Sequence, residues 1–265
     1  MKLIDCHVHA FPDFLAEKAM EKLTKNCGYQ PSTNGTLANT LKVEEKWGCK
    51  NFILLNIATS PNYVEKVNNF LIENNKDGVI SFGSIHPQYH NYKEEIEKLY
   101  QNGIKGVKFH PEYQEFNMDD KAVYPIYEEL AKRDMVMLFH SGFDPAYVGS
   151  HRCDVQRGAK VATDFNGAKL VFAHLGNLMG MDDTLKYLVG KDVYFDISMA
   201  IRYYKFAEIE KFIKSHDINK FLYATDCPWS DGAKTQELVN SLNITNEDKE
   251  KVFYKNAEKL LNITI

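Results

Sequence analysis

Two histidines stand one residue apart near the start of the chain, in the segment Asp5-Cys6-His7-Val8-His9. The segment reads as a β-strand, in which successive side chains point to opposite faces. His7 and His9 then lie on one face, with Cys6 and Val8 on the other. Two imidazoles one pleat apart can hold a single divalent metal ion from the end of a strand. The pair therefore predicts part of a metal site.

Further histidines and one aspartate end other apolar segments of the chain. Random placement would scatter most histidines over helices and loops, so their clustering at such ends favours a functional cause. The six histidines at these ends, of nine in the chain, are His7, His9, His86, His110, His140 and His174. Asp226 ends the last apolar segment. The metal ligands that we expect are His7, His9, His140 and Asp226.

Two of these residues carry predicted catalytic roles. His174 can act as a ligand of a second metal ion, or as a proton donor that also stabilises an oxyanion, and a one-metal site favours the second role. Asp226 is a carboxylate at the end of a hydrophobic strand, which is costly unless it is paired or ligating. We expect Asp226 to bind the metal and to accept the proton of an attacking water with its free oxygen.

Eight short apolar runs must position these side chains. Most are continuous rather than alternating, as is typical of parallel strands covered by helices. The runs are Leu3–His9, Phe52–Ala58, Val79–His86, Gly106–His110, Met135–His140, Lys169–His174, Val193–Ser198 and Phe221–Asp226. Eight βα units in 265 residues predict an α/β fold, a closed (β/α)₈ TIM barrel with residues 1–265 as one domain. An open doubly wound sheet is disfavoured, because His-Ala-Phe-Pro replaces the usual Gly-rich loop after the first strand.

Segments between the runs carry apolar residues at three- and four-residue spacing, which predicts helices. The predicted helices are Val64–Asn74, Tyr92–Gln101, Val123–Arg133, Phe206–Ser215 and a closing helix Asn246–Leu261. We expect substrate specificity to lie in two loops, Phe11–Thr40 and Phe143–Val155.

Bulk properties limit the partners. The formal charge of −4 argues against a general binder of nucleic acid or of membrane surfaces. Five scattered cysteines without a Cys-x-x-Cys pair suit a reducing cytoplasm, and the first residues lack the apolar run of a signal peptide. We therefore expect a cytoplasmic protein with a small-molecule substrate and no nucleic-acid or membrane partner. A homodimer is compatible with such a barrel.

Four basic residues are candidates for binding substrate. Lys108 and His110 share one face of the fourth strand and should point to the barrel axis. Arg152 and Arg202 lie just past the fifth and seventh strands, where a guanidinium group can hold a substrate carboxylate.

The motifs together resemble the amidohydrolase superfamily, in particular its second large branch of amidohydrolase-related, metal-dependent hydrolases. The resemblance covers essentially the whole chain. It rests on Asp-x-His-x-His at 5–9, Gly-Val-Lys-Phe-His-Pro at 106–111, the histidines of strands five and six, Thr-Asp-x-Pro-Trp at 225–229 and Phe-Tyr-Lys-Asn-Ala at 253–257.

The resemblance implies a divalent metal ion, usually zinc, and a catalytic histidine at His174. It places the metal on the residues that match His7, His9, His140 and Asp226. In two-metal members a carboxylated lysine on strand four bridges the ions. If Lys108 were carboxylated, two ions would be present and His174 would become a ligand.

Our interpretation is a metal-dependent hydrolase in which a metal-bound water attacks an amide, lactone or ester bond of a small molecule. The main alternative is a metal-dependent, non-oxidative decarboxylase of a small carboxylic acid, which the Asp-x-His-x-His form mildly disfavours. A phosphodiesterase or deoxyribonuclease is a further alternative, although no bridging Glu stands at the expected strand ends. The last is a barrel that binds a ligand without turnover, which absence of metal from the purified protein would favour.

Overall fold

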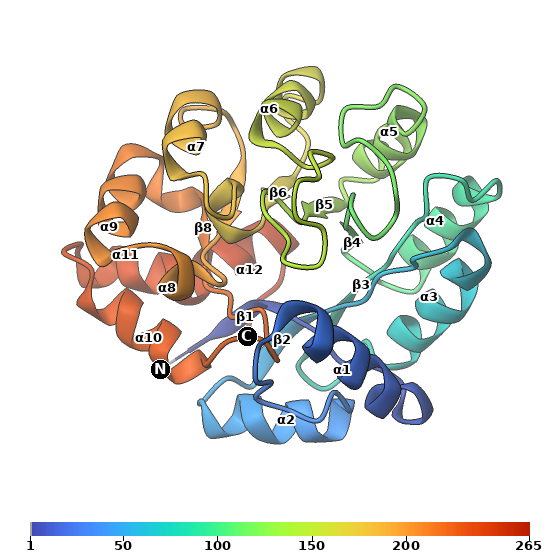
Figure 1. Ribbon diagram of the computed structural model, residues 1–265, viewed down its shortest axis with the longest axis horizontal. Helices are drawn as coiled ribbons and strands as arrows, with labels where there is room; N and C mark the ends of the chain where they lie inside the picture. Colours follow the sequence, from blue (N-terminus) through green and yellow to red (C-terminus); the bar gives the residue numbers. More distant parts are fainter. Residues whose placement is uncertain (1) are drawn as a thin grey trace.

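Eight short parallel strands form the centre of the computed structural model, which describes residues 2–265 (Figure 1). The (β/α)₈ barrel predicted from the sequence is confirmed. The strands are β1 (Ile4–Val8), β2 (Asn51–Leu55), β3 (Val79–Phe82), β4 (Gly106–Phe109), β5 (Val136–Phe139), β6 (Leu170–Phe172), β7 (Tyr194–Asp196) and β8 (Phe221–Leu222).

The strands pair in chain order and close into a ring. Strands β1 to β3 and β4 to β8 form two hydrogen-bonded groups. The groups meet at one junction where the backbone nitrogen of Gly83 donates to Gly106 at 2.8 Å. At the other junction, the backbone nitrogens of Cys6 and Asp226 donate to Tyr223 and His7, at 2.9 Å each. This second junction holds two predicted metal ligands, His7 and Asp226, against each other.

The strands end earlier than the apolar runs predicted, and the predicted site residues lie just beyond them. β6 ends at Phe172, and His174 has a φ of 58°; β8 ends at Leu222, and Asp226 has a φ of 65°. A residue with positive φ cannot continue a strand, and for a non-glycine residue this conformation is strained. The backbone therefore turns at His174 and at Asp226, where each functional side chain points into the site.

Regular alternation fails within β1. The register of β1 against β2 shifts between Asp5 and Val8. Cys6 packs in the apolar cluster inside the barrel, whereas Val8 packs in the outer one. The prediction that these two side chains share a face is therefore wrong, because a shift of register breaks the two-residue period.

Helices surround the strands (Figure 1). Those predicted at α3 (Val64–Glu73), α4 (Tyr92–Gln101), α5 (Tyr124–Lys132) and α9 (Phe206–Ser215) are confirmed within two residues. The closing helix is present as α11 (Asn246–Glu250), a π-helical turn (Lys251–Lys255) and α12 (Asn256–Leu261). The remaining helices are α1 (Asp13–Cys27), α2 (Leu37–Lys46), α6 (Val155–Asp164), α7 (Met181–Tyr187), α8 (Ala200–Tyr203) and α10 (Gly232–Ser241).

The segment Phe11–Thr40 is not the loop that we expected. Helix α1 occupies much of it, with Asp13 in its first turn and Gly28 in the left-handed conformation at its C-terminal end. Only Ala16 and Met20 of α1 are buried, so the helix lacks the broad apolar stripe on which helix prediction depends. No helix in the described part of the chain is both long and apolar enough to cross a membrane.

Two apolar layers fix the barrel. The outer layer lies between strands and helices and includes Phe109, Phe139 and Phe172. The inner layer combines strand residues such as Val136 with Leu260 of α12, which closes the N-terminal end of the barrel. In Figure 1, α12 lies at the more distant end, so the viewer faces the C-terminal ends of the strands.

Gly142 offers a test of how the end of β5 is fixed. Its φ is +86°, and an added Cβ would lie 2.2 Å from the backbone nitrogen of Leu178. Gly142→Ala should therefore lower the free energy of unfolding by about 2–4 kcal/mol, measured by urea denaturation. Gly149→Ala is the control: its φ is +83° with nothing within 4 Å, so it should cost only about 1 kcal/mol. Equal losses in the two variants would contradict the close packing at Gly142.

Candidate metal centre and active site

His7, His9 and Asp226 come together at the C-terminal end of the barrel. Oδ1 of Asp226 lies 3.5 Å from Nε2 of His7 and 3.2 Å from Nε2 of His9. His174 joins them, because one ligand atom each of His7, His174 and Asp226 lies within 4.8 Å of the other two. Three of the four predicted metal ligands therefore meet, with the predicted catalytic histidine beside them.

Hydrogen bonds to neighbouring strands orient the imidazoles of His7 and His9. Nδ1 of His7 lies 2.8 Å from Oδ2 of Asp196, and Nδ1 of His9 lies 2.8 Å from the carbonyl oxygen of Leu55. Each Nδ1 donates its proton there, which leaves the lone pair on Nε2. Both lone pairs then face the same oxygen of Asp226.

This arrangement fits a divalent cation. Burial lowers the pKa of His7 and His174 well below the ordinary value, so their imidazoles are neutral, the form that binds metals. Lone pairs of neutral imidazoles and of a carboxylate repel one another, and Lys108, whose Nζ contacts only Nε2 of His7 among them, relieves part of this repulsion, as a metal ion between the ligands would. A set of nitrogen and oxygen ligands suits zinc, manganese, iron or nickel.

His140, the fourth predicted ligand, lies next to this group. Its Nδ1 is 3.1 Å from Nε2 of His174, and its buried Nε2 has no hydrogen-bond partner within residues 2–265. Burial lowers its pKa well below the ordinary value, so the imidazole is neutral. An unpartnered buried nitrogen costs free energy, and a metal ion would relieve that cost.

His140 also belongs to a second group of possible ligands. Its ring stacks on that of His110 with the centroids 4.1 Å apart, and Nε2 of His110 lies 3.3 Å from Oδ2 of Asp144. One ligand atom each of His110, His140 and Asp144 lies within 4.8 Å of the other two. His140 thus lies between the two groups.

Asp226 is held rigidly at the end of β8. Its backbone nitrogen donates to the carbonyl of His7 at 2.9 Å, and its own carbonyl accepts from Trp229 at 2.7 Å. Burial raises the pKa of its carboxyl group. Its side chain is thus easier to protonate than that of an exposed aspartate when no other charge holds it ionised.

A sequence model of the amidohydrolase family (Amidohydro_2) matches residues 68–263. The chain belongs to this family. The resemblance stated from the motifs is therefore confirmed. No curated protein sequence gives a significant match.

Solved structures share the barrel over nearly the whole chain. They include 5-carboxyvanillate decarboxylase LigW from Sphingomonas paucimobilis, with a TM-score of 0.74 and 13% identity over 100% of both chains. A TIM-barrel protein from Bordetella bronchiseptica gives 0.76 and 17% over 99% of each chain. A dihydroxybenzoic acid decarboxylase from a Polaromonas species, with bound manganese and 2-nitroresorcinol, gives 0.71 and 14%, over 98% of this chain and 97% of that one. At these identities the similarity establishes the fold alone.

Lys108 supplies a positive charge inside the amidohydrolase barrel. Its Nζ lies 3.2 Å from Nε2 of His7, and its side chain is fully buried. Burial lowers its pKa to about 8, although Asp196 and Asp226 attract the charge. The predicted orientation of Lys108 toward the barrel axis is therefore correct, and its contact with a predicted metal ligand places it at the centre itself.

Lys108 should make stability depend on pH. Between pH 8 and its ordinary pKa of 10.5, the unfolded chain binds more protons at this lysine than the native state, so native stability rises with pH. We expect the free energy of unfolding of wild type, relative to Lys108→Met, to rise by about 2–4 kcal/mol across this window. The measurement is urea denaturation of chelator-treated protein. For the exposed Lys105→Met control, the difference should stay flat; a flat difference for Lys108→Met would contradict the lowered pKa.

The two predicted substrate-binding arginines differ in their surroundings. Nη1 of Arg152 lies 3.6 Å from Oε2 of the buried Glu112, so its charge has a carboxylate partner within the protein. The guanidinium of Arg202 lies over the ring of Tyr29, 4.1 Å from its centre, and donates to the backbone carbonyl of Trp229 at 3.4 Å. Of the two arginines, only Arg202 lacks a carboxylate partner among the described residues.

Two residues of the site escaped the sequence analysis. Oγ of Ser198 lies 2.8 Å from Nδ1 of His174 and also contacts Asp196, so it links the two side chains. Ser198 ends the seventh predicted strand, and this strand-end position is the sequence signal that points to it. Asp144 follows the turn after β5, and only the structure brings it to His110.

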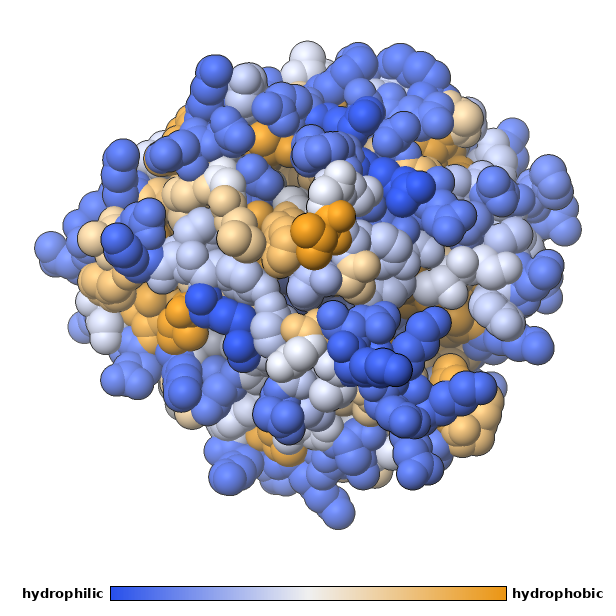
Figure 2. Space-filling model, viewed as in Figure 1, coloured by the Kyte–Doolittle hydropathy of each residue, from blue (hydrophilic) through white to orange (hydrophobic). Residues whose placement is uncertain are grey.

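Aromatic rings surround the site. The ring of Tyr113 lies 4.5 Å from that of His110 and 4.9 Å from that of Tyr147, between centroids. Burial raises the pKa of Tyr29 and of Tyr113, and the carboxylates of Asp144 and Asp226 raise both further. Figure 2 shows less hydrophilic side chains gathered around the middle of this face, with hydrophilic ones at its margin.

Proposed function

We propose that the protein is a metal-dependent decarboxylase of a small aromatic carboxylic acid. The observation that carries the proposal is the combination of a histidine and aspartate cluster with an aromatic ring beside it, since the ring of Tyr113 lies 4.5 Å from that of His110, which stacks on His140. Planar substrates are held well by such rings. Two of the similar structures are named as decarboxylases of aromatic acids, 5-carboxyvanillate and dihydroxybenzoic acid, which supports the same choice.

The resident cofactor in this proposal is one divalent metal ion. His7, His9 and Asp226 would hold it, with His140, whose buried Nε2 has no partner among the described residues, as a further ligand. When bound, the ion would neutralise the negative charge of the substrate carboxylate and orient it. Manganese bound to the Polaromonas decarboxylase makes manganese a candidate alongside zinc.

The reaction breaks the bond between the ring and the carboxylate carbon, so that carbon dioxide leaves and a proton takes its place on the ring. Asp226 is the residue that we expect to hold this proton. Its Oδ1 faces His7 and His9, which leaves Oδ2 to carry the proton toward the substrate. The imidazole of His174 is held in place by Ser198. It is positioned to stabilise charge that develops on an oxygen attached to the substrate ring.

Hydrolysis of an amide, lactone or ester remains the second candidate function. It is favoured by the Asp5-x-His7-x-His9 form, which places the imidazoles of His7 and His9 against Asp226. In that reaction Asp226 would accept a proton from water rather than deliver one to a carbon. Which of the two reactions occurs depends on whether the substrate carries a carboxylate or a hydrolysable bond.

The two candidates are separated by product analysis. Metal-loaded protein is incubated with 2,6-dihydroxybenzoate and 5-carboxyvanillate, and separately with aryl esters, lactones and anilides. The proposal expects release of carbon dioxide and the decarboxylated phenol from at least one acid, and loss of that activity in Asp226→Asn. Hydrolysis of the neutral panel, without release of carbon dioxide from the acids, would contradict it.

A further inference from the structure

The residues of the metal centre are almost closed off from solvent. The relative exposure of His7 is 1%, that of His174 is 2% and that of Asp226 is 9%. A small molecule cannot reach them unless part of the structure moves aside. Some segment at the C-terminal end of the barrel must therefore open when a ligand binds or leaves.

The segment of residues 12–32, which follows β1 and contains α1, reaches across this end to the loops after β7 and β8. The hydroxyl group of Tyr29 contacts that of Tyr203 in α8. The backbone nitrogen of Ser32 donates to the carbonyl of Pro228 at 2.8 Å. These contacts of Tyr29 and Ser32 form a latch that fastens the segment to the other side of the barrel mouth.

Helix α1 makes up most of this segment and is weakly attached. Only Ala16 and Met20 are buried, whereas Phe14 is 90% exposed. Within residues 2–265, the side chains of α1 form no ion pair, and their hydrogen bonds stay within residues 24–29. Few interactions are lost when such a helix moves away from the barrel.

The loop after β5, on the opposite side of the mouth, is held more firmly. The buried carboxylate of Glu112 accepts a hydrogen bond from the backbone nitrogen of Arg152 at 3.1 Å. The backbone nitrogen of Phe143 donates to the carbonyl of Leu178 at 3.1 Å. Opening this loop would break such buried hydrogen bonds, so residues 12–32 move at lower cost in free energy.

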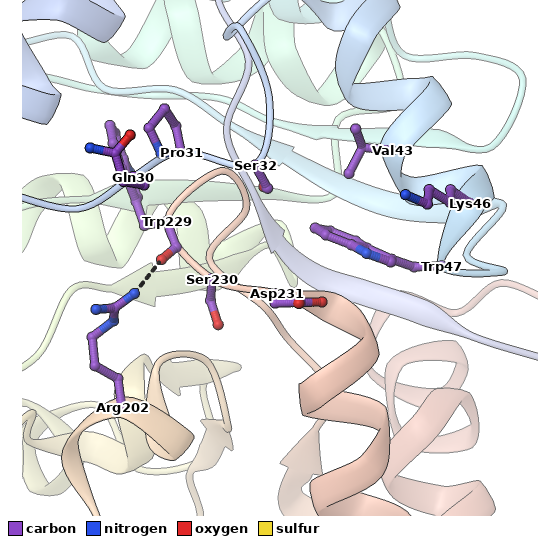
Figure 3. A pocket seen from close by; sticks show the side chains of 10 residues that line it. All are labelled: Gln30, Pro31, Ser32, Val43, Lys46, Trp47, Arg202, Trp229, Ser230 and Asp231. Carbon is purple, nitrogen blue, oxygen red and sulfur yellow. Dashed lines mark hydrogen bonds between the residues drawn. The ribbon is translucent and has the colours of Figure 1, made fainter.

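A cavity of about 330 Å³ lies beside the latch. Gln30, Pro31 and Ser32 line it together with Trp229 of the loop after β8 (Figure 3). Protein interiors are otherwise densely packed, so empty space at this point lets the latch shift without displacing other side chains.

We infer that residues 12–32 form a gate over the metal centre, which opens when the latch contacts of Tyr29 and Ser32 are released. The two ends of the gate stay together, because the backbone nitrogen of Phe11 donates to the carbonyl of Gly35 at 2.8 Å. The inference goes beyond the proposed function and does not depend on which bond the enzyme breaks, since any small molecule has to reach the same buried residues.

An engineered disulfide closes the gate reversibly. Oγ of Ser32 lies 3.7 Å from Sγ of Cys227, so Ser32→Cys brings two sulfur atoms within reach of a bond. The parent protein is Cys27→Ser, which removes the half-buried thiol of the gate, whereas the other cysteines are buried. Oxidation then fastens the gate to the loop after β8, and a phosphine reductant, removed before the assay, releases it.

The measurement is the removal of zinc from the zinc-loaded, full-length protein by 1,10-phenanthroline, a planar aromatic chelator. We expect the second-order rate constant to be at least about tenfold lower for oxidised than for reduced Ser32→Cys, with the same initial zinc content. The Cys27→Ser parent should give one rate in both conditions. Equal rates for the oxidised and reduced variant would overturn the inference.

Tyr29→Ala tests the gate without a disulfide. The variant loses the ring and hydroxyl group that contact Tyr203, so zinc removal should become about fivefold faster. The control is Tyr100→Ala, which changes a tyrosine of α4 that is 52% exposed and should leave the rate unchanged. Equal rates in the two variants would also overturn the inference. None of these measurements requires turnover, so they are independent of the reaction catalysed.

Discussion

Replacing Asp226 with asparagine is expected to lower turnover about 10²- to 10⁴-fold, while most of the metal stays bound. The amide keeps the shape of the carboxylate and one oxygen that can face the ion. It cannot take up or release the proton that either candidate reaction requires. The effect should appear in kcat rather than in KM, because Asp226 is not the group that holds the substrate.

The test of Asp226 needs two controls. Asp231→Asn changes a carboxylate five positions later that caps α10 and lies outside the metal cluster, so turnover should stay within about twofold of wild type. Elemental analysis of Asp226→Asn shows how much metal remains. Turnover near that of wild type in the metal-loaded variant would remove Asp226 from the mechanism.

Asp196→Asn is expected to weaken metal binding about 10- to 100-fold, although Asp196 is not itself a predicted metal ligand. Its Oδ2 accepts the proton of Nδ1 of His7 at 2.8 Å, and its Oδ1 accepts from the backbone nitrogens of His174 and Ser198, at 2.9 and 3.1 Å. An amide group in place of Oδ2 would set two donors against each other. His7 would then turn or change tautomer and withdraw the lone pair on Nε2.

Competition with a chromogenic chelator measures this loss of affinity. Asp192→Asn is the control, since Asp192 is exposed and pairs with Lys220 at 2.6 Å away from the site. Its metal affinity should equal that of wild type. If Asp196→Asn bound metal as tightly as wild type, His7 would not depend on Asp196 for its orientation.

Much of the fold could be predicted because its signals are local. Continuous apolar runs, such as Val136–Phe139 of β5, and the three- and four-residue periodicity of α4 and α9 depend on near neighbours in the sequence. The predicted strands extend beyond the observed strand ends. The turns at His174 and Asp226 use a strained backbone conformation that the residue types do not indicate. Helix α1 was missed because it buries only two residues.

The candidate site was predicted in part for the same reason. His7, His9 and Asp226 stand out by type and position, and the closed barrel brings them together. The partners that orient them come from side-chain packing across the barrel, as with Asp196 on His7 or Asp144 on His110. Sequence alone also gave no sign that Arg152 is paired with Glu112, whose carboxylate lies on the loop after β4.

The central claim is that one divalent ion is held at the meeting point of His7, His9 and Asp226. Elemental analysis of purified, metal-supplemented protein tests it most directly, with His7→Ala/His9→Ala as the comparison. We predict one equivalent per chain in wild type and almost none in the double variant. No bound metal in wild type, or an undiminished equivalent in the double variant, would contradict it.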